Sequence, residues 1–349
     1  MFTHNVKYSI FHDIVPFFSC QAERTTQSHA MSNPLVTALA GVTIASSRPD
    51  LLVSLFSEIL GWDRVSDAPL DEELRPFWGA SPEADDSCVI LSASGANRGM
   101  VRIIAGPDRA PTDKLRTRLA GVEILVARDL TQLYSKVAVH PAFATTHRPF
   151  ETDWSDYGSN VHRAFIGIGT GGTHLAFTMA VTTPVGRDFP ATDAGVGYIF
   201  DVPLLTANYD ASSRFYRETL GMIPILESHF TDAQWHALWD LPSESPVHLD
   251  ILKGDAPDTG LGGIELQGYE QHLIDDTPAR PDRLDGGASI LTYTSTDIEA
   301  AFAAVSADPS AKILGPLRPI AGAPYNGTRA FCFMGPDGER IEICEQSWR

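Results

Sequence analysis

The chain contains 349 residues, of which 43% are hydrophobic, and its formal net charge at pH 7 is −18. This length is enough for two domains with ordinary hydrophobic cores. The acidic balance, with no basic run, argues against nucleic acid and anionic membrane surfaces as partners, and no apolar stretch is long enough for a transmembrane helix.

The first part of the chain stands apart from the rest. Its apolar stretch at 14–18 is short, is interrupted by Pro16 and lacks the basic region of a signal peptide. We therefore expect residues 1–33 to be a flexible N-terminal extension, or Met31 to be the natural start. The four cysteines form no CxxC pair, which favours reduced thiols and a cytoplasmic location.

A short motif, Ala-Gly-Val, occurs three times, at 40–42, 120–122 and 194–196, and a looser copy, Gly-Gly-Ala, lies at 286–288. Each copy opens a strand-like run, and the copies begin roughly 75 to 90 residues apart, which indicates internal repetition. One such unit is too small for a comfortable independent domain. The repeats therefore predict four units paired into two domains, an N-terminal pair over 34–183 and a C-terminal pair over 192–349.

After each opening strand the sequence predicts one helix and about three strands. The helices at 51–62 and 212–222 have apolar residues at helical spacing, and Gly61 and Gly221 stand where a left-handed residue ends a helix. The second and fourth helices begin at the expected N-caps Asp129 and Asp297. The clearest local signal is a hairpin over 328–344 with a Gly-Pro-Asp-Gly turn.

Three segments resemble the vicinal oxygen chelate superfamily, which contains glyoxalases, bleomycin-resistance proteins and type I extradiol dioxygenases. These segments are SLFSEILGW (54–62), SRFYRETLGM (213–222) and FMGPDGERIEICE (333–345). The resemblance implies an α+β fold of four βαβββ modules, paired into two glyoxalase-like domains whose cup-shaped mixed sheets surround a metal and a small substrate. The four-module layout is similar to that of ring-cleaving extradiol dioxygenases.

Aligning the last strand of each repeat places ionisable residues in one column, namely Arg102, His174, Glu265 and Glu342. Glu342 matches the position that supplies the carboxylate ligand in the resembling family. Glu265 and Glu342 are expected to face each other across one cup, where burial and like-charge repulsion raise a carboxyl pKa and suit acid–base catalysis.

The opening strands depart from the family pattern. Resembling enzymes place a metal-binding His just after the strand-opening Gly, where this chain has Val or Ala. One residue further on, Glu123 is the only strong ligand, so ordinary extradiol cleavage is not expected. A relocated metal set of Glu342, Glu265 and His248 is one alternative, and a role for His248 in hydrogen bonding or at the surface is another. Glu123 with His174 is the minority alternative in the N-terminal pair.

The sequence therefore predicts an enzyme acting on a small hydrophobic, aromatic or oxygenated substrate, with Tyr198, Trp235, Tyr325 and Arg329 lining its site. The expected chemistry is a metal-assisted or carboxylate-driven isomerase or lyase reaction, with a divergent ring-cleaving dioxygenase as a special case. The cofactor is one divalent metal (Fe, Mn or Zn) or none. The alternative is a non-catalytic sequestering protein of the bleomycin-resistance type. A homo-oligomer is compatible with either function.

Overall fold

The structure is a computed structural model, and it describes residues 34–81, 86–96, 98–108, 119–155, 161–182, 195–254, 263–273, 282–345 and 348. The expected extension over 1–33 lies outside the described residues, as do most of the boundary positions between the two expected domains. Among the described helices, none has the length and apolar character needed to cross a lipid bilayer.

Each repeat begins with a strand, continues with a helix and adds three further strands. The first repeat contains β1 (Leu39–Ser46), α1 (Pro49–Ser54), β2 (Asp63–Asp67), α2 (Leu74–Phe77), β3 (Cys88–Ser92) and β4 (Met100–Ala105). The second contains β5 (Gly121–Val126), α3 (Leu130–Val137), β6 (Phe143–Asp153), β7 (Val161–Gly169) and β8 (His174–Ala180). The third contains β9 (Val196–Thr206), α4 (Tyr209–Arg214), β10 (Ile223–Phe230), α5 (Ala233–Trp239), β11 (Val247–Lys253) and β12 (Gly263–Gly268). The fourth contains β13 (Gly287–Thr294), α6 (Ile298–Ala307), β14 (Lys312–Pro319), β15 (Arg329–Met334) and β16 (Arg340–Cys344).

The helix ends follow the local sequence signals. Helices α1 and α4 each continue into one π-helical turn, and the chain then reverses at Gly61 and Gly221, whose φ angles are 74° and 69°. Only glycine adopts this left-handed conformation without a steric penalty, so the predicted C-caps are confirmed. The side chain of Asp129 accepts a hydrogen bond from the backbone N–H of Gln132, and Asp297 accepts one from Ala300. Both predicted N-caps are confirmed.

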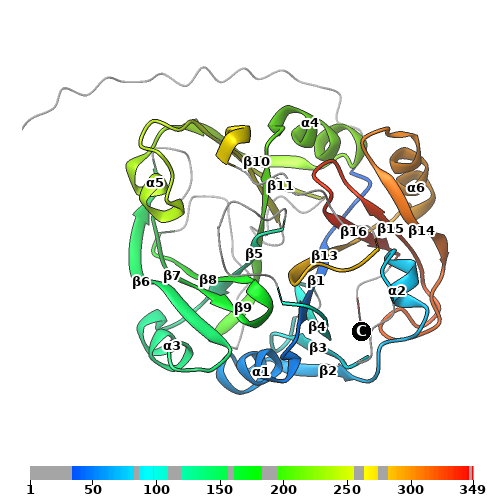
Figure 1. Cartoon of the computed structure of the whole chain (residues 1–349), viewed down its shortest axis with the longest axis horizontal. Coiled ribbons are helices and arrows are strands. Elements are labelled where there is room, and N and C mark those ends of the chain that lie inside the picture. Colours follow the sequence, from blue (N-terminus) through cyan, green and yellow to red (C-terminus); the bar gives the residue numbers. More distant parts are fainter. Residues whose placement is uncertain are drawn as a thin grey trace, which may run out of the picture. The chain divides into compact units, whose positions relative to one another are not determined.

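The strands form two eight-stranded mixed sheets, and the α+β class is confirmed. The terminal sheet joins the first and fourth repeats in the order β14-β15-β16-β13-β1-β4-β3-β2. The central sheet joins the third and second repeats in the order β10-β11-β12-β9-β5-β8-β7-β6. In Figure 1 the terminal sheet therefore carries the blue and red ends of the colour scale, and the central sheet carries the green and yellow middle.

This pairing differs from the one that the sequence predicted. Strand β1 pairs antiparallel with β13, and β5 pairs antiparallel with β9, so each sheet contains one repeat from each half of the chain. The expected pairs over 34–183 and 192–349 are wrong in this respect. The reason is that all four opening strands are apolar and similar, so their pattern does not specify which two of them pair.

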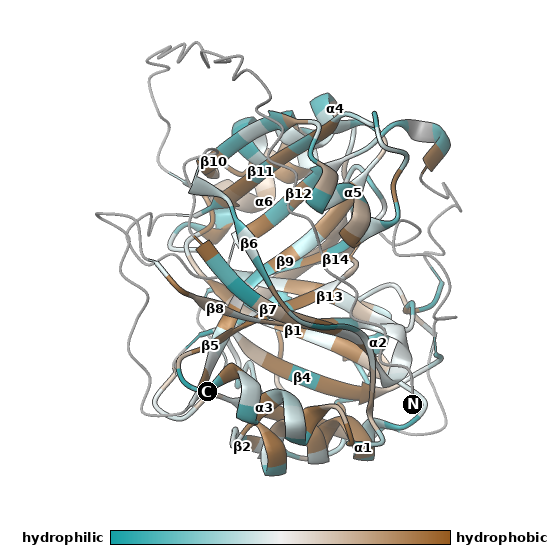
Figure 2. Ribbon diagram, turned by 90° about the vertical axis from the view of Figure 1, so that its left-hand side faces the viewer, coloured by the Kyte–Doolittle hydropathy of each residue, from teal (hydrophilic) through white to brown (hydrophobic). Residues whose placement is uncertain are grey.

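The largest hydrophobic cluster packs α1, α3, α6 and the turn after α4 against one face of both sheets. It contains Phe165 and Phe177, whose rings stack 4.7 Å apart, together with Leu291 of the terminal sheet. Strand β4 is buried along its whole length, and Figure 2 shows it as largely hydrophobic with one hydrophilic interruption. That interruption is explained by Arg102, which is fully buried.

Candidate active site

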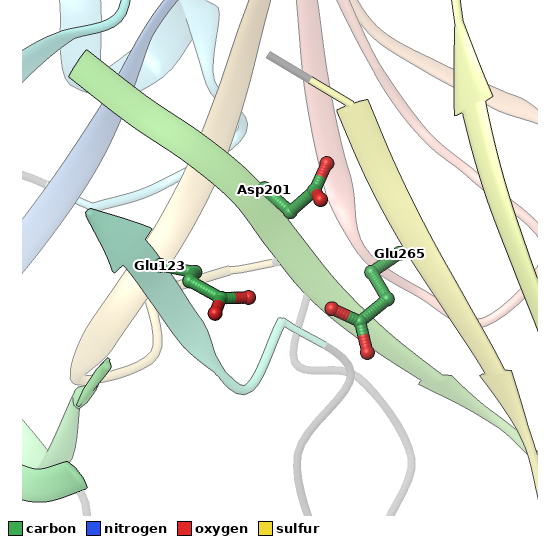
Figure 3. A group of neighbouring side chains, drawn as sticks. All are labelled: Glu123, Asp201 and Glu265. Carbon is green, nitrogen blue, oxygen red and sulfur yellow. The ribbon is translucent and has the colours of Figure 1, made fainter. Parts of the chain in front are cut away.

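Three carboxylates meet in the middle of the central sheet. Glu123 lies on β5, Asp201 on the neighbouring β9 and Glu265 on β12, which is the next strand across (Figure 3). Glu123 is directly opposite Asp201 in the antiparallel ladder. One carboxylate oxygen of each residue lies within 4.8 Å of one from each of the others. Three charges of one sign are therefore concentrated in a space that a single cation could fill.

The carboxylates lie beside a cavity of about 130 Å³, called the cup below. Side chains in a strand alternate between its two faces, so residues at every second position of the central sheet point into the cup. On β8 these are His174, Ala176 and Thr178, and on β7 they are His162, Ala164 and Ile166. The strands on the other side of β9 contribute Leu249, Ile251, Glu265 and Gln267.

The wall of the cup away from the carboxylates is aromatic. Trp235 makes edge contacts with Trp154 and Phe230, at ring-centroid distances of 5.5 and 5.6 Å. Trp239 lies 5.9 Å from Trp235, and the ring of His174 stacks on Trp239 at 6.0 Å. Aromatic faces of this kind favour flat, apolar molecules.

Burial makes three ionised carboxylates unfavourable at this place. Burial raises the pKa of Glu265 to about 8, and the negative charge of Glu123 adds to the shift. Burial also raises the pKa of Asp201 well above its usual range, with contributions from Glu265 and Glu123, although Lys253 opposes it. The pKa of Glu123 is raised by burial as well. Without a cation, the cluster therefore holds protons near neutral pH.

The donor set fits a divalent cation with a preference for oxygen ligands. Asp201 is only 1% exposed, and its Oδ1 has no hydrogen-bond partner among the described residues. A Cβ at position 263 would lie 2.4 Å from this oxygen, so Gly263 provides the space that the Asp201 carboxylate occupies. Three carboxylates suit hard cations such as Mg²⁺ or Mn²⁺ better than they suit softer metals that favour nitrogen or sulfur.

The residues predicted as the catalytic pair do not meet. Glu265 lies in the cup, but Glu342 lies on β16 of the terminal sheet, so the expectation that they face each other is wrong. Glu342 is fully buried and accepts hydrogen bonds from Trp78 Nε1 (2.7 Å), Tyr325 Oη (2.6 Å) and Thr292 Oγ1 (3.0 Å). The protein itself therefore satisfies the Glu342 carboxylate. The prediction was wrong because the expected pairing of the third and fourth repeats places Glu342 in the same sheet as Glu265.

The side chains of the terminal sheet fill the face that corresponds to the cup. The Arg102 guanidinium lies 4.4 Å from the ring centroids of both Trp78 and Trp348, and its Nη1 donates to the Tyr325 hydroxyl. Its Nη2 is 3.7 Å from Glu342 Oε1. Tyr325 is thus a member of this buried network and does not line the cup.

Of the other residues predicted for the site, one lines the cup and three lie elsewhere. Trp235 lines the cup as expected. His248 points to the opposite face of β11, where its Nδ1 lies 3.2 Å from His229 Nε2, so it is not brought together with Glu265 or Glu342. Arg329 pairs with Glu299 and Glu345 near the start of α6. Tyr198 is half-buried on β9 and is not among the residues that line the cup.

Asp201 is the site residue that the sequence analysis missed. The opening strand β9 has 11 residues, and Asp201 lies further along it than the positions directly after Ala-Gly-Val where a ligand is expected. Counting back from the helix N-cap would have found it, because Asp201 precedes Asn208 by about the distance that separates Glu123 from Asp129.

The predicted alignment of the last strands is also wrong for the second repeat, because His174 is not equivalent to Glu265. Strand β12 places Glu265 beside Pro203, two residues after Asp201, whereas β8 places His174 beside Gly121, two residues before Glu123. The position equivalent to Glu265 is therefore Thr178, whose hydroxyl donates a hydrogen bond to Glu123. His174 lies at the edge of the cup and not in the carboxylate cluster.

Comparison with known proteins agrees with this architecture. Residues 195–343 match the family model described as the Glyoxalase/Bleomycin resistance protein/Dioxygenase superfamily. A point mutant of glyoxalase I from Zea mays has 15% identity and a TM-score of 0.61, and the match covers 88% of this chain and 92% of that one. A protein from Bacillus subtilis with a proposed dioxygenase activity has 12% identity and a TM-score of 0.56, over 90% of this chain and 86% of that one.

At these identities the solved structures establish a likeness of fold. No curated protein matches the sequence significantly. Residues 195–343 match the glyoxalase/bleomycin resistance protein/dioxygenase superfamily, and the chain as a whole is similar in fold to glyoxalase I, in agreement with the superfamily that the sequence resembles.

Proposed function

We propose that the cup is the active site of an enzyme that binds one divalent cation through Glu123, Asp201 and Glu265 and acts on a small organic molecule. The observation that supports this most directly is the cluster of three buried carboxylates within 4.8 Å beside an apolar cavity. Such a cluster is stable when a cation or protons balance its charge. Similarity to this superfamily makes metal-assisted chemistry the first hypothesis to test.

The carboxylates differ in how the protein holds them. Thr178 donates a hydrogen bond to Glu123, and Gln267 Nε2 donates to Glu265 Oε1 at 2.7 Å, whereas Asp201 Oδ1 lacks a donor among the described groups. A bound cation would act as a Lewis acid on an oxygen of the substrate. A carboxyl group whose pKa lies near neutrality can accept a proton from one carbon and return it to the next, which is the step of an isomerase. In a lyase reaction it would accept the proton from carbon while a second, protonated carboxyl group gives its proton to the departing group.

The size of the cup limits the substrate. A cavity of about 150 Å³ in another protein is large enough for benzene, so a cup of about 130 Å³ admits roughly one ring. The aromatic wall would contact the ring, and an oxygen substituent would point towards the carboxylates. We therefore propose a single-ring or similarly compact oxygenated substrate.

The test is cation binding by the purified protein, measured by calorimetry with Mn²⁺ and by metal analysis after dialysis. The wild type is expected to bind one equivalent, and Asp201→Asn and Glu265→Gln are each expected to weaken binding at least tenfold. Glu342→Gln is the matched control, because Glu342 is an equally buried glutamate of the other sheet. Equal binding by all four proteins, or none by the wild type, would refute the proposed cation site.

Ligand sequestration without turnover is the second candidate. It is favoured by the aromatic wall of the cup, where Trp235 lines the cavity and its indole N–H donates to Tyr269 Oη at 3.2 Å. Such a wall binds a ring whether or not a reaction follows. Binding of a one-ring phenol together with no conversion of a panel of oxygenated rings would select this function over catalysis.

A further inference from the structure

A directional chain of hydrogen bonds leads from the wall of the cup to Glu265. Trp235 Nε1 donates to Tyr269 Oη at 3.2 Å, and Tyr269 Oη donates to Gln267 Oε1 at 2.7 Å. Gln267 Nε2 then donates to Glu265 Oε1 at 2.7 Å. All four residues are at least nine-tenths buried, and Gln267 is fully buried. Packing therefore holds these four side chains in place, and water competes little for their hydrogen bonds.

When Glu265 is ionised, the chemistry of the groups favours one direction along this chain. An indole N–H is a donor and never an acceptor, so the Tyr269 oxygen accepts from Trp235 and its hydrogen is free to reach Gln267. The Gln267 carbonyl oxygen accepts that hydrogen, which turns the amide N–H towards Glu265. The opposite orientation of the amide would place its N–H₂ against the Tyr269 hydroxyl and its carbonyl oxygen against a carboxylate oxygen.

We propose that Gln267 and Tyr269 are positioning residues that keep Oε1 of Glu265 as a hydrogen-bond acceptor and leave its other oxygen for the cation or proton of the cup. This inference rests on the proposed function, because it names the residues that orient Glu265, one of the three proposed cation ligands. Glu265 and Gln267 share one side of β12 at alternate positions, and Tyr269 directly follows the last residue of the strand, Gly268.

The support of Glu265 differs from that of the other two carboxylates. Glu123 receives a threonine hydroxyl, which can rotate away, and Asp201 Oδ1 receives no donor among the described residues. Among the hydrogen bonds between described residues, those that hold Glu265 are the ones that also reach the aromatic wall. A ring that packs on Trp235 therefore contacts the first member of the chain that ends at the proposed ligand.

Substitution of Tyr269 by Phe tests the proposal, since it removes one hydroxyl and preserves the ring. Without that hydroxyl the Gln267 amide can flip, and Glu265 loses a donor that favours its ionised form. We expect the pKa of Glu265 in the metal-free protein to rise by about half a unit to one unit. We expect Mn²⁺ affinity to fall by about ten- to a hundredfold, as for other residues that orient a ligand.

The titration is followed by NMR of the protein labelled with ¹³C at the glutamate side-chain carboxyl, with the Glu265 signal assigned by its absence in Glu265→Gln. Mn²⁺ affinity is measured by calorimetry on the same samples. Tyr325→Phe is the matched control, because the Tyr325 hydroxyl is equally buried and donates to Glu342 in the terminal sheet. It should leave both the Glu265 titration and Mn²⁺ affinity unchanged. Gln267→Met is the second variant in case Tyr269→Phe does not fold.

The outcomes separate the two proposals. Folded Tyr269→Phe and Gln267→Met variants that keep the wild-type Glu265 titration overturn the positioning role, even if the wild type binds Mn²⁺. A Glu265 titration that shifts in these variants while the wild type binds no Mn²⁺ supports the positioning role and rejects the cation site. A shift in titration together with weaker Mn²⁺ binding supports both.

Discussion

The ionisation of Glu265 is the residue-scale property with the largest expected consequence. Its pKa is raised by burial to about 8 in the folded state, above the ordinary value of 4.5. The folded protein thus binds this proton more tightly than the unfolded chain, and the resulting stability is complete below pH 4.5 and is lost as the pH rises towards 8. A cation in the cup would offset that loss.

We therefore expect the free energy of unfolding of the metal-free protein to fall between about pH 5 and pH 8. Glu265→Gln should make this slope shallower, and Mn²⁺ should restore stability at pH 8 more strongly in the wild type than in Glu265→Gln. Urea unfolding with EDTA or with Mn²⁺ measures both effects. Glu58→Gln, at an exposed helical position, is the control. Identical slopes for the wild type and Glu265→Gln would show that burial does not perturb Glu265.

His162 gives a prediction of the opposite sign. It is 8% exposed in the wall of the cup, and burial lowers its pKa to about 4 from 6.5. The unfolded chain takes up this proton first, so stability falls as the pH drops from 6.5 to 4, by up to about 3 kcal/mol. His162→Phe should remove most of that loss, as measured by urea unfolding at pH 7 and pH 4. The exposed His272→Ala should retain it.

At this scale the sequence predicted part of the site. Glu265 and Trp235 both line the cavity, and the catalytic and binding roles predicted for them stay predictions. The argument that buried carboxylates share protons applies to the observed cluster. The partners were different, because Asp201 lies in a strand whose described residues are almost all buried and which therefore shows no polar alternation. A fully buried strand gives no periodic signal for the direction of its side chains.

At the scale of elements, the strands β4 and β16 place a buried ion pair where the central sheet has its cup. Arg102 and Glu342 are both fully buried. Arg102 donates to Thr43 and Tyr325, and Glu342 accepts from Trp78, Thr292 and Tyr325. Removing one charge of such a pair leaves the other uncompensated in the interior. The pair therefore acts as a structural replacement for a site in this sheet.

Glu342→Ala should accordingly destabilise the protein by about 3 to 5 kcal/mol. Replacing both residues, as in Arg102→Met with Glu342→Leu, should cost less than the single change, since apolar side chains of similar volume leave no unpaired charge. A double-mutant cycle by urea unfolding measures the difference. Mn²⁺ binding should survive in every folded member of the cycle. An additive cycle would mean that the two charges do not interact.

Local signals predicted the elements themselves well. Helix caps, the glycines that end α1 and α4, and the hairpin of β15 and β16 depend on a few neighbouring residues, and the structure contains all of them. Position within a sheet depends on contacts between residues far apart in the chain. The pairing of β1 with β13 depends on such distant contacts, so the local sequence pattern does not predict it.

At the scale of the whole described fold, each sheet needs both halves of the chain. The segment 192–349 contains β9 to β12 and β13 to β16, but the partners of β9 and β13 across the sheet centres, β5 and β1, lie in the other half. Expressed alone, either half would expose a long apolar strand at the edge of a half-sheet, which favours aggregation or self-association. The position of the cup depends on the same junction, because Glu123 and Asp201 come from the two strands that meet there.

We therefore expect separately produced fragments 34–183 and 192–349 to lack cooperative unfolding as monomers, and to regain it when they are refolded together. Size-exclusion chromatography with light scattering and circular dichroism follows the association. The matched control is a fragment over 119–273, which contains both repeats of the central sheet and all three carboxylates. This fragment should fold more readily than either half, since its sheet is complete. A monomeric 192–349 fragment that unfolds cooperatively would instead mean that the third and fourth repeats can pair with each other when the first two are absent.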